Sequence, residues 1–311
     1  MTLEQLRIFV AVAEAGHMTR AAETLGITQS AASAAIAALE TRYDMKLFDR
    51  IGRGIELSET GETFLPEAKA VLNRAALAVE ALNDLAGLKR GTVSIHASQT
   101  IASYWLPARI VRFRKAYPQI EVKLAIGNTA QVARAVLEGE VDLGFIEGAV
   151  NEPRLVRTKV GRDRLVIVVG PGHPWADGLP VPSAELWRGP WVLREQGSGT
   201  RSEFEHALEG HGTTPDDLNL ALELPGNEAV IGAVASGGFA TAISELAVRP
   251  LLQVGALVQV NFDLPERSLE LLRHRERRRR RAAEAFAASL EAQALPINMP
   301  VAKTRRPPTT T

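Results

Sequence analysis

The stretch that decides the fold of the N-terminal part is LEQLRIFVAVAEAGHMTRAAETLGITQSAASAAIAALE, residues 3–40. Apolar side chains recur at helical spacing over residues 3–15, and a glycine then ends this first helix. A second, short helix is expected over residues 19–25, where its first residue, a threonine, can cap it and a glycine follows its end. Thr28 is expected to cap a third helix that runs to about Tyr43. Two short helices joined by a tight turn predict a helix-turn-helix.

The third helix has two distinct sides when its residues are placed at 3.6 per turn. The side expected to pack inward carries Ala32, Ile36, Leu39 and Tyr43. The opposite side carries small or polar residues, namely Gln29, Ser30, Ser33, Ala34 and Ala37. This pattern predicts a helix that packs by one side and offers the other to a partner.

A small hairpin is expected after the helix-turn-helix, within KLFDRIGRGIELSETGETF, residues 46–64. Apolar residues alternate with Glu56 in its second half, as they do in a strand. Arg50 and Arg53 flank a tip that contains glycines. The segment predicts a wing with basic residues at its end.

A long helix is expected over residues 61–88, where apolar residues recur every three to four positions and Pro66 lies near the start. A helix of about 25 residues spans roughly 40 Å at ~1.5 Å per residue. One apolar stripe of that length needs a partner surface, and a second copy of the chain is the simplest one.

Beyond Gly91 the pattern changes to alternating strands and helices, which predicts α/β layers with mainly parallel sheets. Strands are expected over residues 92–98 and 120–127, with a helix over 101–118 between them. After a break at residues 151–153, a strand at 164–170 begins what we expect to be a second lobe. Further alternation follows, and a helix at residues 277–293 closes the fold. The proline-containing tail, residues 295–311, is expected to be disordered.

Composition limits the class of protein without identifying a partner. Apolar residues make up 46% and charged residues 23% of the 311, as in soluble globular proteins, and no apolar run is long enough for a membrane span. The formal net charge is zero, which neither supports nor excludes binding to DNA. The chain has no cysteine, so disulfides and thiolate metal sites are excluded. The N-terminus lacks the features of a signal peptide, and a cytoplasmic location is expected.

An ordered set of residues over the first 60 positions resembles the DNA-binding end of LysR-type transcriptional regulators. The matching parts are Leu3–Phe9, Ala21-Ala22, Thr28-Gln29-Ser30, Ser33, Leu39-Glu40, Leu47-Phe48-Asp49-Arg50 and Thr60-Gly61. The resemblance continues to about residue 294, and its later marks include Ser98-Gln99-Thr100, Gly127-Asn128-Thr129, Arg194-Glu195 and Gly197-Ser198-Gly199-Thr200-Arg201. It is strongest to the subgroup that controls operons of sulfur assimilation, sulfite response and carbon fixation.

The resemblance implies a mixed fold: a winged helix-turn-helix (residues 1–60), a linker and dimerisation helix (61–90), and a two-lobed α/β effector domain (91–294) similar to periplasmic binding proteins. Within that domain, lobe I is expected at about residues 91–161 and 267–294, and lobe II at about 162–266. The implied partners are promoter DNA, a second copy through the linker helix, a homotetramer of two such dimers, and RNA polymerase. No membrane partner and no cofactor are expected.

The same resemblance assigns roles in DNA binding to the exposed side of the third helix. Gln29, Ser30 and Ser33 are the expected groove residues, because a major groove admits one helix and glutamine can bond adenine. Ala34 is placed to touch a thymine methyl group, and Thr28, at the helix start, a phosphate. Arg50 and Arg53 on the wing would meet the backbone or the minor groove. The alternative is a solvated helix face beside an ordinary basic hairpin.

A second site is expected between the lobes, where strand ends and helix starts favour a small anion. The residues assigned to it are Ser98, Gln99, Thr100, Asn128, Thr129, Glu147, Ser198, Gly199, Thr200 and Arg201. Residues 98–100 could instead be plain helix caps, and residues 197–201 a glycine turn with an exposed arginine. Glu147 could pair with Arg201 or bond a hydroxyl of the effector.

Other interpretations of the chain remain open at this point. A solute-binding protein without a DNA role would share the two lobes, although it would not need the N-terminal 90 residues. An enzyme is disfavoured because no nucleophile with a base and no nucleotide fingerprint is present. The six histidines show no metal-ligand spacing, so no metal is expected. The arginine run at residues 277–281 is interpreted as a solvated face rather than a nucleic-acid site.

Overall fold

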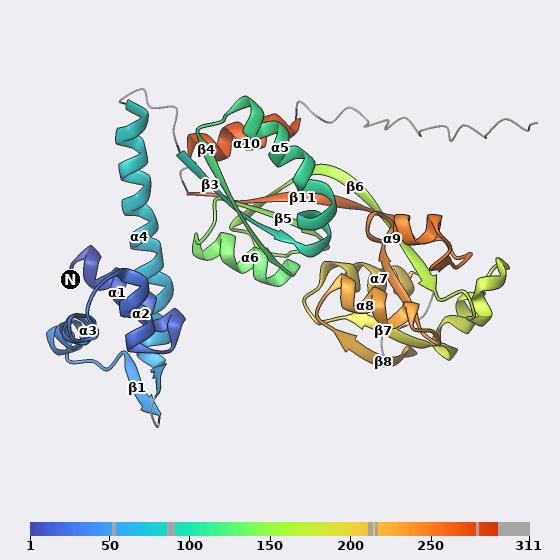
Figure 1. Cartoon of the computed structure of the whole chain (residues 1–311), viewed down its shortest axis with the longest axis horizontal. Coiled ribbons are helices and arrows are strands. Elements are labelled where there is room, and N and C mark those ends of the chain that lie inside the picture. Colours follow the sequence, from blue (N-terminus) through green and yellow to red (C-terminus); the bar gives the residue numbers. More distant parts are fainter. Residues whose placement is uncertain (52–53, 86–90, 211–213, 215–216, 278–279, 292–311) are drawn as a thin grey trace, which may run out of the picture.

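The structure of the chain is a computed structural model that describes residues 1–51, 54–85, 91–210, 214, 217–277 and 280–291. Along the chain it forms a small helical head, a long helix and two α/β lobes (Figure 1). The tail expected at residues 295–311 lies outside the described residues. Within them, no helix is both long and apolar enough to cross a bilayer.

Three helices form the head: α1 (Leu3–Ala15), α2 (Met18–Leu25) and α3 (Gln29–Tyr43). Thr28 caps α3 as expected, because its Oγ1 accepts a hydrogen bond from the amide of Ala31 at 3.2 Å. The expected threonine cap of α2 is wrong. Its cap is His17, whose Nδ1 accepts from the amide of Thr19 at 3.2 Å, so α2 begins one residue earlier.

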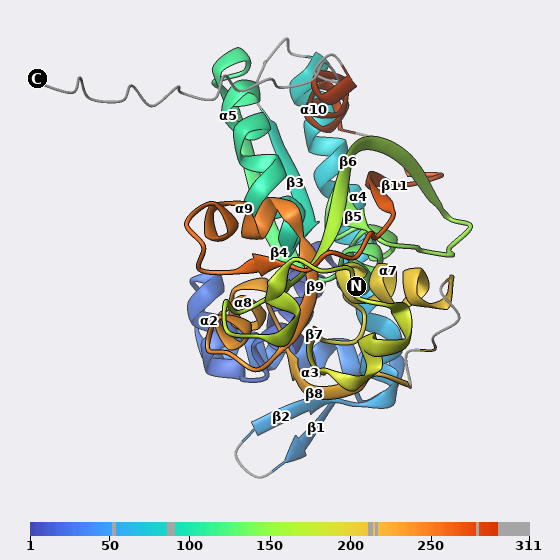
Figure 2. The same ribbon diagram turned by 90° about the vertical axis from the view of Figure 1, so that its right-hand side faces the viewer.

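The wing is a two-stranded antiparallel hairpin made of β1 (Phe48–Ile51) and β2 (Gly54–Leu57). Its base is fixed to α3 because Oε1 of Glu40 accepts from the amide of Leu47 at 2.8 Å. The fully buried ring of Phe9 in α1 lies 5.4 Å from that of Phe48 and 5.1 Å from that of Phe64. One core therefore joins α1, the hairpin and the long helix, and the hairpin projects from this end of the molecule (Figure 2).

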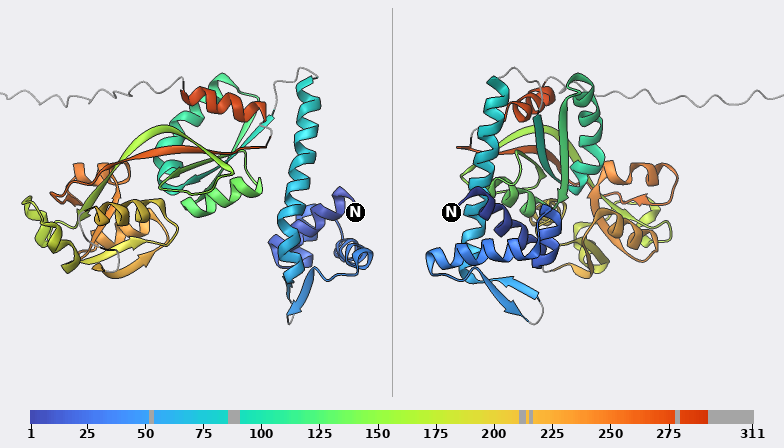
Figure 3. Two further views of the ribbon diagram at one scale, coloured as in Figure 1. Left: turned by 180° about the vertical axis from the view of Figure 1, so that it is seen from behind. Right: turned by 60° about the vertical axis from the view of Figure 1, so that its left-hand side comes forward.

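The long helix α4 (Glu59–Leu85) stands as a column, with the head packed on its first half (Figure 3). It begins two residues before the expected start, and its expected last turn, residues 86–88, lies outside the described residues. Val71, Val79 and Leu82 on α4 are all exposed in the single chain. Beyond the head, α4 therefore carries apolar side chains that are exposed to solvent in the single chain.

The first lobe contains the strands β3 (Gly91–Ser98), β4 (Ile120–Gly127) and β5 (Leu143–Glu147) and the helices α5 (Leu106–Ala116), α6 (Thr129–Glu138) and α10 (Arg281–Glu291). Strand β3 lies between β4 and β5 and is parallel to both. Helices α5 and α10 cover one face of the sheet and α6 covers the other (Figure 1). The helix expected at residues 101–118 is a π-helical turn, Ile101–Trp105, followed by α5. The closing helix α10 begins at Arg281 rather than at residue 277, and its expected last residues, 292 and 293, lie outside the described residues.

Two long strands run between the lobes: β6 (Leu155–Val169) and β11 (Glu266–His274). They pair antiparallel with each other, and β11 also pairs antiparallel with β5. The separate strand expected at residues 164–170 is therefore the second half of one continuous strand. The expectation of mainly parallel sheets holds among β3, β4 and β5 but fails for the strands that pair with β6 and β11.

The second lobe contains β7 (Pro190–Arg194), β8 (Asn219–Leu224), β9 (Ala240–Ser244), β10 (Val258–Gln259), α7 (Gly199–Glu209), α8 (Asn227–Ala235) and α9 (Glu245–Gln253), with 3-10 turns at Pro174–Asp177 and Ser183–Arg188. Strand β7 is parallel to β8 and β9, and β9 is antiparallel to β6. The loop after β7 and the start of α8 meet the strand ends of the first lobe. The fold thus brings the ends of strands from both lobes together.

Candidate DNA-binding and effector-binding sites

Helix α3 presents the expected two sides. Ile36 and Leu39 are 5% and 2% exposed and pack in the core of the head, together with Ala32. Thr28, Gln29, Ser30 and Ala34 are exposed and Ser33 is half-buried. The Nε2 of Gln29 donates to the Oγ of Ser33 at 3.0 Å, so these two polar groups lie side by side one turn apart. This side of α3 is free to meet a duplex.

One expectation about the head is wrong, and another concerns side chains outside the described part of the chain. Tyr43 was expected to pack inward but is 49% exposed, because it lies at the last residue of α3, beyond the buried side chains. Arg50 lies in β1 opposite Ile55, and its side chain, like all of Arg53, is outside the described residues. The position of the basic wing tip therefore stays a prediction.

In the first lobe, the expected effector residues follow the ends of β3 and β4. Ser98 ends β3, and Gln99 and Thr100 directly follow it, with Ser98 and Thr100 buried. Asn128 caps α6, because its Oδ1 accepts from the amide of Gln131 at 3.0 Å. Its Nδ2 donates to Glu195 of the second lobe at 3.3 Å. Plain capping was the alternative for residues 98–100, but the Thr100 side chain makes no capping hydrogen bond to the turn that follows it.

Glu147, the last residue of β5, is buried beneath these groups. Ser98 Oγ donates to Oε2 of Glu147, and Thr129 Oγ1 donates to the Glu147 carbonyl at 2.6 Å. Burial raises the pKa of Glu147 above its ordinary value, although the charge of Arg267 and the bond from Ser98 act in the opposite direction. Two roles were considered for Glu147, and the structure does not show the first of them, a pairing with Arg201. The partners of Arg201 are Glu205, Glu223 and the Arg194 carbonyl.

The loop of the second lobe lies directly against the first. Ser198, Gly199 and Thr200 are buried at the start of α7. A Cβ atom at Gly199 would lie 1.7 Å from the Glu147 carbonyl oxygen, so only glycine allows this approach. The amide of Ala130 donates to the carbonyl of Gly197 at 3.3 Å. These contacts show the lobes closed on each other at this point.

Arg201 does not have the environment expected of it. Its Nε donates to Glu205 at 2.7 Å, and its Nη1 donates to Glu223 and to the carbonyl of Arg194. The guanidinium is therefore neither an exposed group on a glycine turn nor a free cation at the cleft. Its two carboxylate partners already balance its charge.

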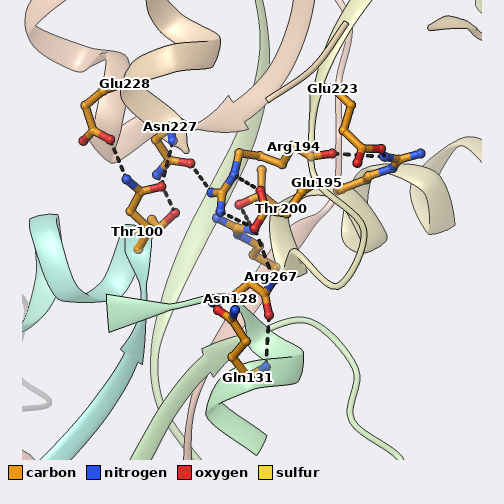
Figure 4. A network of polar contacts seen from close by, with 12 residues as sticks. Thr100, Asn128, Gln131, Arg194, Glu195, Thr200, Glu223, Asn227, Glu228 and Arg267 are labelled. Carbon is orange, nitrogen blue, oxygen red and sulfur yellow. Dashed lines mark hydrogen bonds and ion pairs between the residues drawn. The ribbon is translucent and has the colours of Figure 1, made fainter. Parts of the chain in front are cut away.

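A buried cation that the sequence analysis did not assign lies beside Thr200, where the two lobes meet. Arg267 of β11 donates to Oδ2 of Asp163 at 2.6 Å and 2.8 Å. Its Nη1 donates to Thr200 Oγ1 at 3.2 Å (Figure 4). The side chains of Arg267 and Asp163 are each 1% exposed. One sequence signal was available: Arg267 shares its side of the strand with the buried Leu269 and Leu271, where a charge is unusual.

Arg194 and Asn227 complete the polar network between the lobes (Figure 4). Arg194 Nη1 donates to Asn227 Oδ1 at 2.6 Å, and Asn227 donates through its amide to Gln99 at 2.7 Å and through Nδ2 to Thr100 at 3.2 Å. Although burial raises the pKa of Glu195, hydrogen bonds and charge from Arg194 hold it below its ordinary value. The sequence analysis noted Arg194 only as a mark of resemblance and did not single out Asn227.

The cleft as a whole offers hydroxyl groups, amides and two guanidinium groups, which are donors suited to an anion. These donors already have protein partners, and three of the contacts, Asn227 with Gln99, Asn227 with Thr100 and Asn128 with Glu195, join the two lobes. A ligand would therefore replace existing contacts. In the described part of the chain, no three histidine or carboxylate side chains gather as a metal site would require.

Comparison with known proteins accounts for nearly the whole chain. A family model described as "LysR substrate binding domain" matches residues 86–295, and one described as "Bacterial regulatory helix-turn-helix protein, lysR family" matches residues 3–62. The chain is 37% identical over 288 residues to the "Uncharacterized HTH-type transcriptional regulator YeiE" of Escherichia coli (strain K12), covering 92% of this chain and 96% of the relative. It is 32% identical over 294 residues to the "Probable RuBisCO transcriptional regulator" of Cyanophora paradoxa, covering 93% and 91%.

Solved structures agree with this assignment. Full-length CbnR complexed with its target DNA has a TM-score of 0.70 at 20% identity, over 94% of this chain and all of that chain, and supports the fold. The regulatory domain of CcmR from Synechocystis PCC6803, in complex with 2-PG, has a TM-score of 0.61 at 25% identity, over 68% of this chain and 100% of that chain. The chain therefore belongs to the LysR family of DNA-binding transcriptional regulators with an effector-binding domain.

Proposed function

We infer that this regulator binds a small anion between its two lobes and that the bound anion changes how the head engages promoter DNA. The observation that carries this proposal is the buried polar network in which Thr100, Asn227, Thr200 and Arg267 meet across the cleft. Here these groups are held by protein partners, and an anion entering between the lobes would exchange some of these contacts for charge-assisted bonds. The CcmR regulatory domain, in complex with 2-PG, supports a small ligand in this kind of domain.

The proposed effector residues are those assigned from the sequence, with Arg267, Arg194 and Asn227 added. Arg201 keeps an indirect role, because its bond to the Arg194 carbonyl holds the end of β7 in place. Binding shifts the protein only if the anion prefers one arrangement of the lobes over another. Closure of the cleft around the anion is the arrangement that we propose.

On the DNA side, we propose that Gln29, Ser30 and Ser33 contact base edges and that Ala34 contacts a thymine methyl group. Thr28 at the start of α3, with Arg50 and Arg53 on the wing, would contact phosphates. Few basic groups reach the duplex from one chain, so a second chain is needed to double the phosphate contacts.

The assembly proposed for this regulator is a dimer through α4, and a homotetramer built from two such dimers. The exposed Val79 and Leu82 on α4 support a helical partner, which a second copy supplies. The proposed domains are residues 1–60, 61–90 and 91–294. RNA polymerase is the proposed further partner, and the cytoplasm, where the DNA lies, is the proposed location. A solute-binding role without DNA is disfavoured, because residues 3–62 match the regulatory helix-turn-helix family.

Calorimetric titration of the full chain with sulfate, sulfite, phosphate, nitrate and sugar phosphates tests the effector proposal. For an anion that binds, Thr100→Val should weaken the affinity by tenfold or more, because a hydrogen bond to a charged group contributes about 1.5–3 kcal/mol. Thr92→Val, at the far end of β3, the strand that precedes Thr100, is the matched control and should leave the affinity unchanged. Equal affinities of wild type and Thr100→Val would overturn the assignment of the cleft.

A further inference from the structure

A second polar pocket lies at the junction of α4 and the first lobe, away from the cleft. It encloses about 40 Å³, and its walls include Asn73, Gly139, Asp142, Arg273, Arg277 and Arg280. Helix α6 separates it from the cleft: Asn128 caps α6 at the cleft, and Gly139 caps it at the pocket. Ten residues of helix span about 15 Å, so the two sites do not share a ligand.

Positive charge exceeds negative charge in this pocket. Three guanidinium groups line it, and the one carboxylate among the described lining residues, Asp142, already has partners. Its Oδ2 accepts two hydrogen bonds from Ser94, each 2.8 Å long, and its Oδ1 lies 3.3 Å from Nε of Arg280. Among the described lining residues, three cationic guanidinium groups therefore stand against one carboxylate.

Arg277 is the residue whose environment is incomplete. Its Nη1 atom is buried and has no hydrogen-bond partner among the described residues. Burial lowers the pKa of Arg277, and the charge of Glu138 only partly opposes this effect. Glu138 is itself paired with Arg134 at 2.7 Å. A buried cationic N–H without an acceptor is costly, and such groups in proteins are normally completed by water or an ion.

These observations correct the interpretation of residues 277–281 as a solvated face for Arg277 and Arg280, whereas Arg281 is exposed as expected. Arg277 is half-buried over the C-terminal end of α6, and the Arg280 side chain is 14% exposed. Residues 278 and 279 lie outside the described residues. The arginine run therefore turns at least two of its cations inward, toward a pocket rather than toward solvent or nucleic acid.

We propose that this pocket is a second anion site, which binds a single inorganic ion of the size of chloride through Arg277 and its arginine neighbours. The volume favours such an ion, because a cavity needs only about 10–15 Å³ of free space to hold one water molecule. A sugar phosphate or an organic acid would not fit. The site does not depend on the ligand proposed for the cleft.

The location gives the site a structural consequence. Asn73 of α4 forms part of the wall and donates through Nδ2 to the carbonyl of Gly139. One turn earlier, Lys69 pairs with Glu140 of the first lobe and with Glu14 of α1. An anion in the pocket neutralises the cations beside this contact and so strengthens the attachment of α4 and the head to the lobe.

The test uses the full chain and bromide as the probe, because bromide replaces chloride and scatters anomalously. Crystals soaked in sodium bromide should show an anomalous peak in the pocket for the wild type and for Arg275→Gln, and none for Arg277→Gln. Arg275 is the control because it is exposed and lies two residues away. A peak that persists in Arg277→Gln, or an occupant without anomalous signal in the wild type, would overturn the proposal in favour of an adventitious ion or a water molecule.

A solution measurement keeps the proposal testable if Arg277→Gln does not crystallise. At constant ionic strength, replacing sodium gluconate by sodium chloride should raise the thermal midpoint of the wild type and of Arg275→Gln by a few degrees and leave that of Arg277→Gln unchanged. Thr100→Val, altered in the cleft, should keep the chloride response. Loss of that response in Thr100→Val would instead place the anion in the cleft, and equal responses of all variants would contradict the pocket site.

Discussion

Replacement of Arg267 by methionine should destabilise the protein far more than loss of any single surface ion pair. The Arg267 and Asp163 side chains are each 1% exposed, and the guanidinium donates twice to the same carboxylate oxygen, at 2.6 Å and 2.8 Å. Arg267→Met leaves the Asp163 carboxylate buried, with the Ser244 hydroxyl donating to its Oδ1. Breaking one partner of such a buried pair costs about 3–5 kcal/mol, which is a large share of a typical total stability of about 5–15 kcal/mol.

The structure supplies a matched control next to this pair. Arg162 and Glu266 are the direct sequence neighbours of Asp163 and Arg267, and they form an ion pair of 3.4 Å with side chains 70% and 62% exposed. Because solvent screens exposed pairs, Arg162→Met should cost no more than about 1 kcal/mol. Both ion pairs link the same two strands, β6 and β11. The difference in stability between the two variants therefore reports the effect of burial rather than of position in the fold.

Urea unfolding of the full chain, followed by far-UV circular dichroism at 25 °C, measures the difference. The midpoint of Arg267→Met should fall by an amount that corresponds to about 3–5 kcal/mol, whereas that of Arg162→Met should stay close to the wild type. The double variant Arg267→Met with Asp163→Leu should recover much of the loss, because no buried charge remains. If Arg267→Met is no more destabilising than Arg162→Met, the reasoning about the buried pair is refuted.

Three further predictions concern close approaches and a buried acid. Gly61→Ala should lower the thermal midpoint, because its Cβ would lie 2.1 Å from the Leu47 carbonyl oxygen, whereas Gly232→Ala, with open space around it, should not. Gly199→Ala should push the lobes apart and weaken anion binding in calorimetry while DNA binding without effector persists; unchanged anion affinity would count against a closed cleft. Burial raises the pKa of Glu147, so the folded state binds the Glu147 proton more tightly than the unfolded state does. The stability that this proton contributes is present below the ordinary pKa and is lost as the pH rises toward the raised pKa. The stability of the wild type relative to Glu147→Gln should therefore increase as pH is lowered from 7 to 5, and a difference independent of pH would contradict this account.

The head could be predicted from sequence because its determinants are local. Helical spacing of apolar residues and the Thr28 cap lie within a few residues of the elements that they fix. The errors there were local as well: His17 caps α2 through a side-chain nitrogen, and Tyr43 lies past the end of the buried side chains. The helical spacing of apolar residues continues to Tyr43, the last residue of α3. The core of the head ends before it, so its side chain is exposed.

The cleft could be predicted only in part, because its main partners are far apart in sequence. Strand ends followed by small polar residues pointed to Thr100 and Thr200, which do meet Asn227 and Arg267 there. Nothing in the local sequence relates Arg267 to Asp163, about a hundred residues earlier, since their pairing depends on the antiparallel register of β6 and β11. The glycine-rich loop suggested a free arginine, but its acceptors come from α7 and β8.

The central claim is that the exposed polar side of α3 reads promoter sequence. The direct measurement is the ratio of specific to non-specific DNA affinity, by fluorescence anisotropy at several salt concentrations, on the promoter beside the gene for this chain. The double variant Gln29→Ala with Ser33→Ala should reduce that ratio by tenfold or more and leave the salt slope unchanged, whereas Thr41→Ala, exposed at the far end of α3, should leave both unchanged. A double variant that keeps the full ratio would contradict the claim.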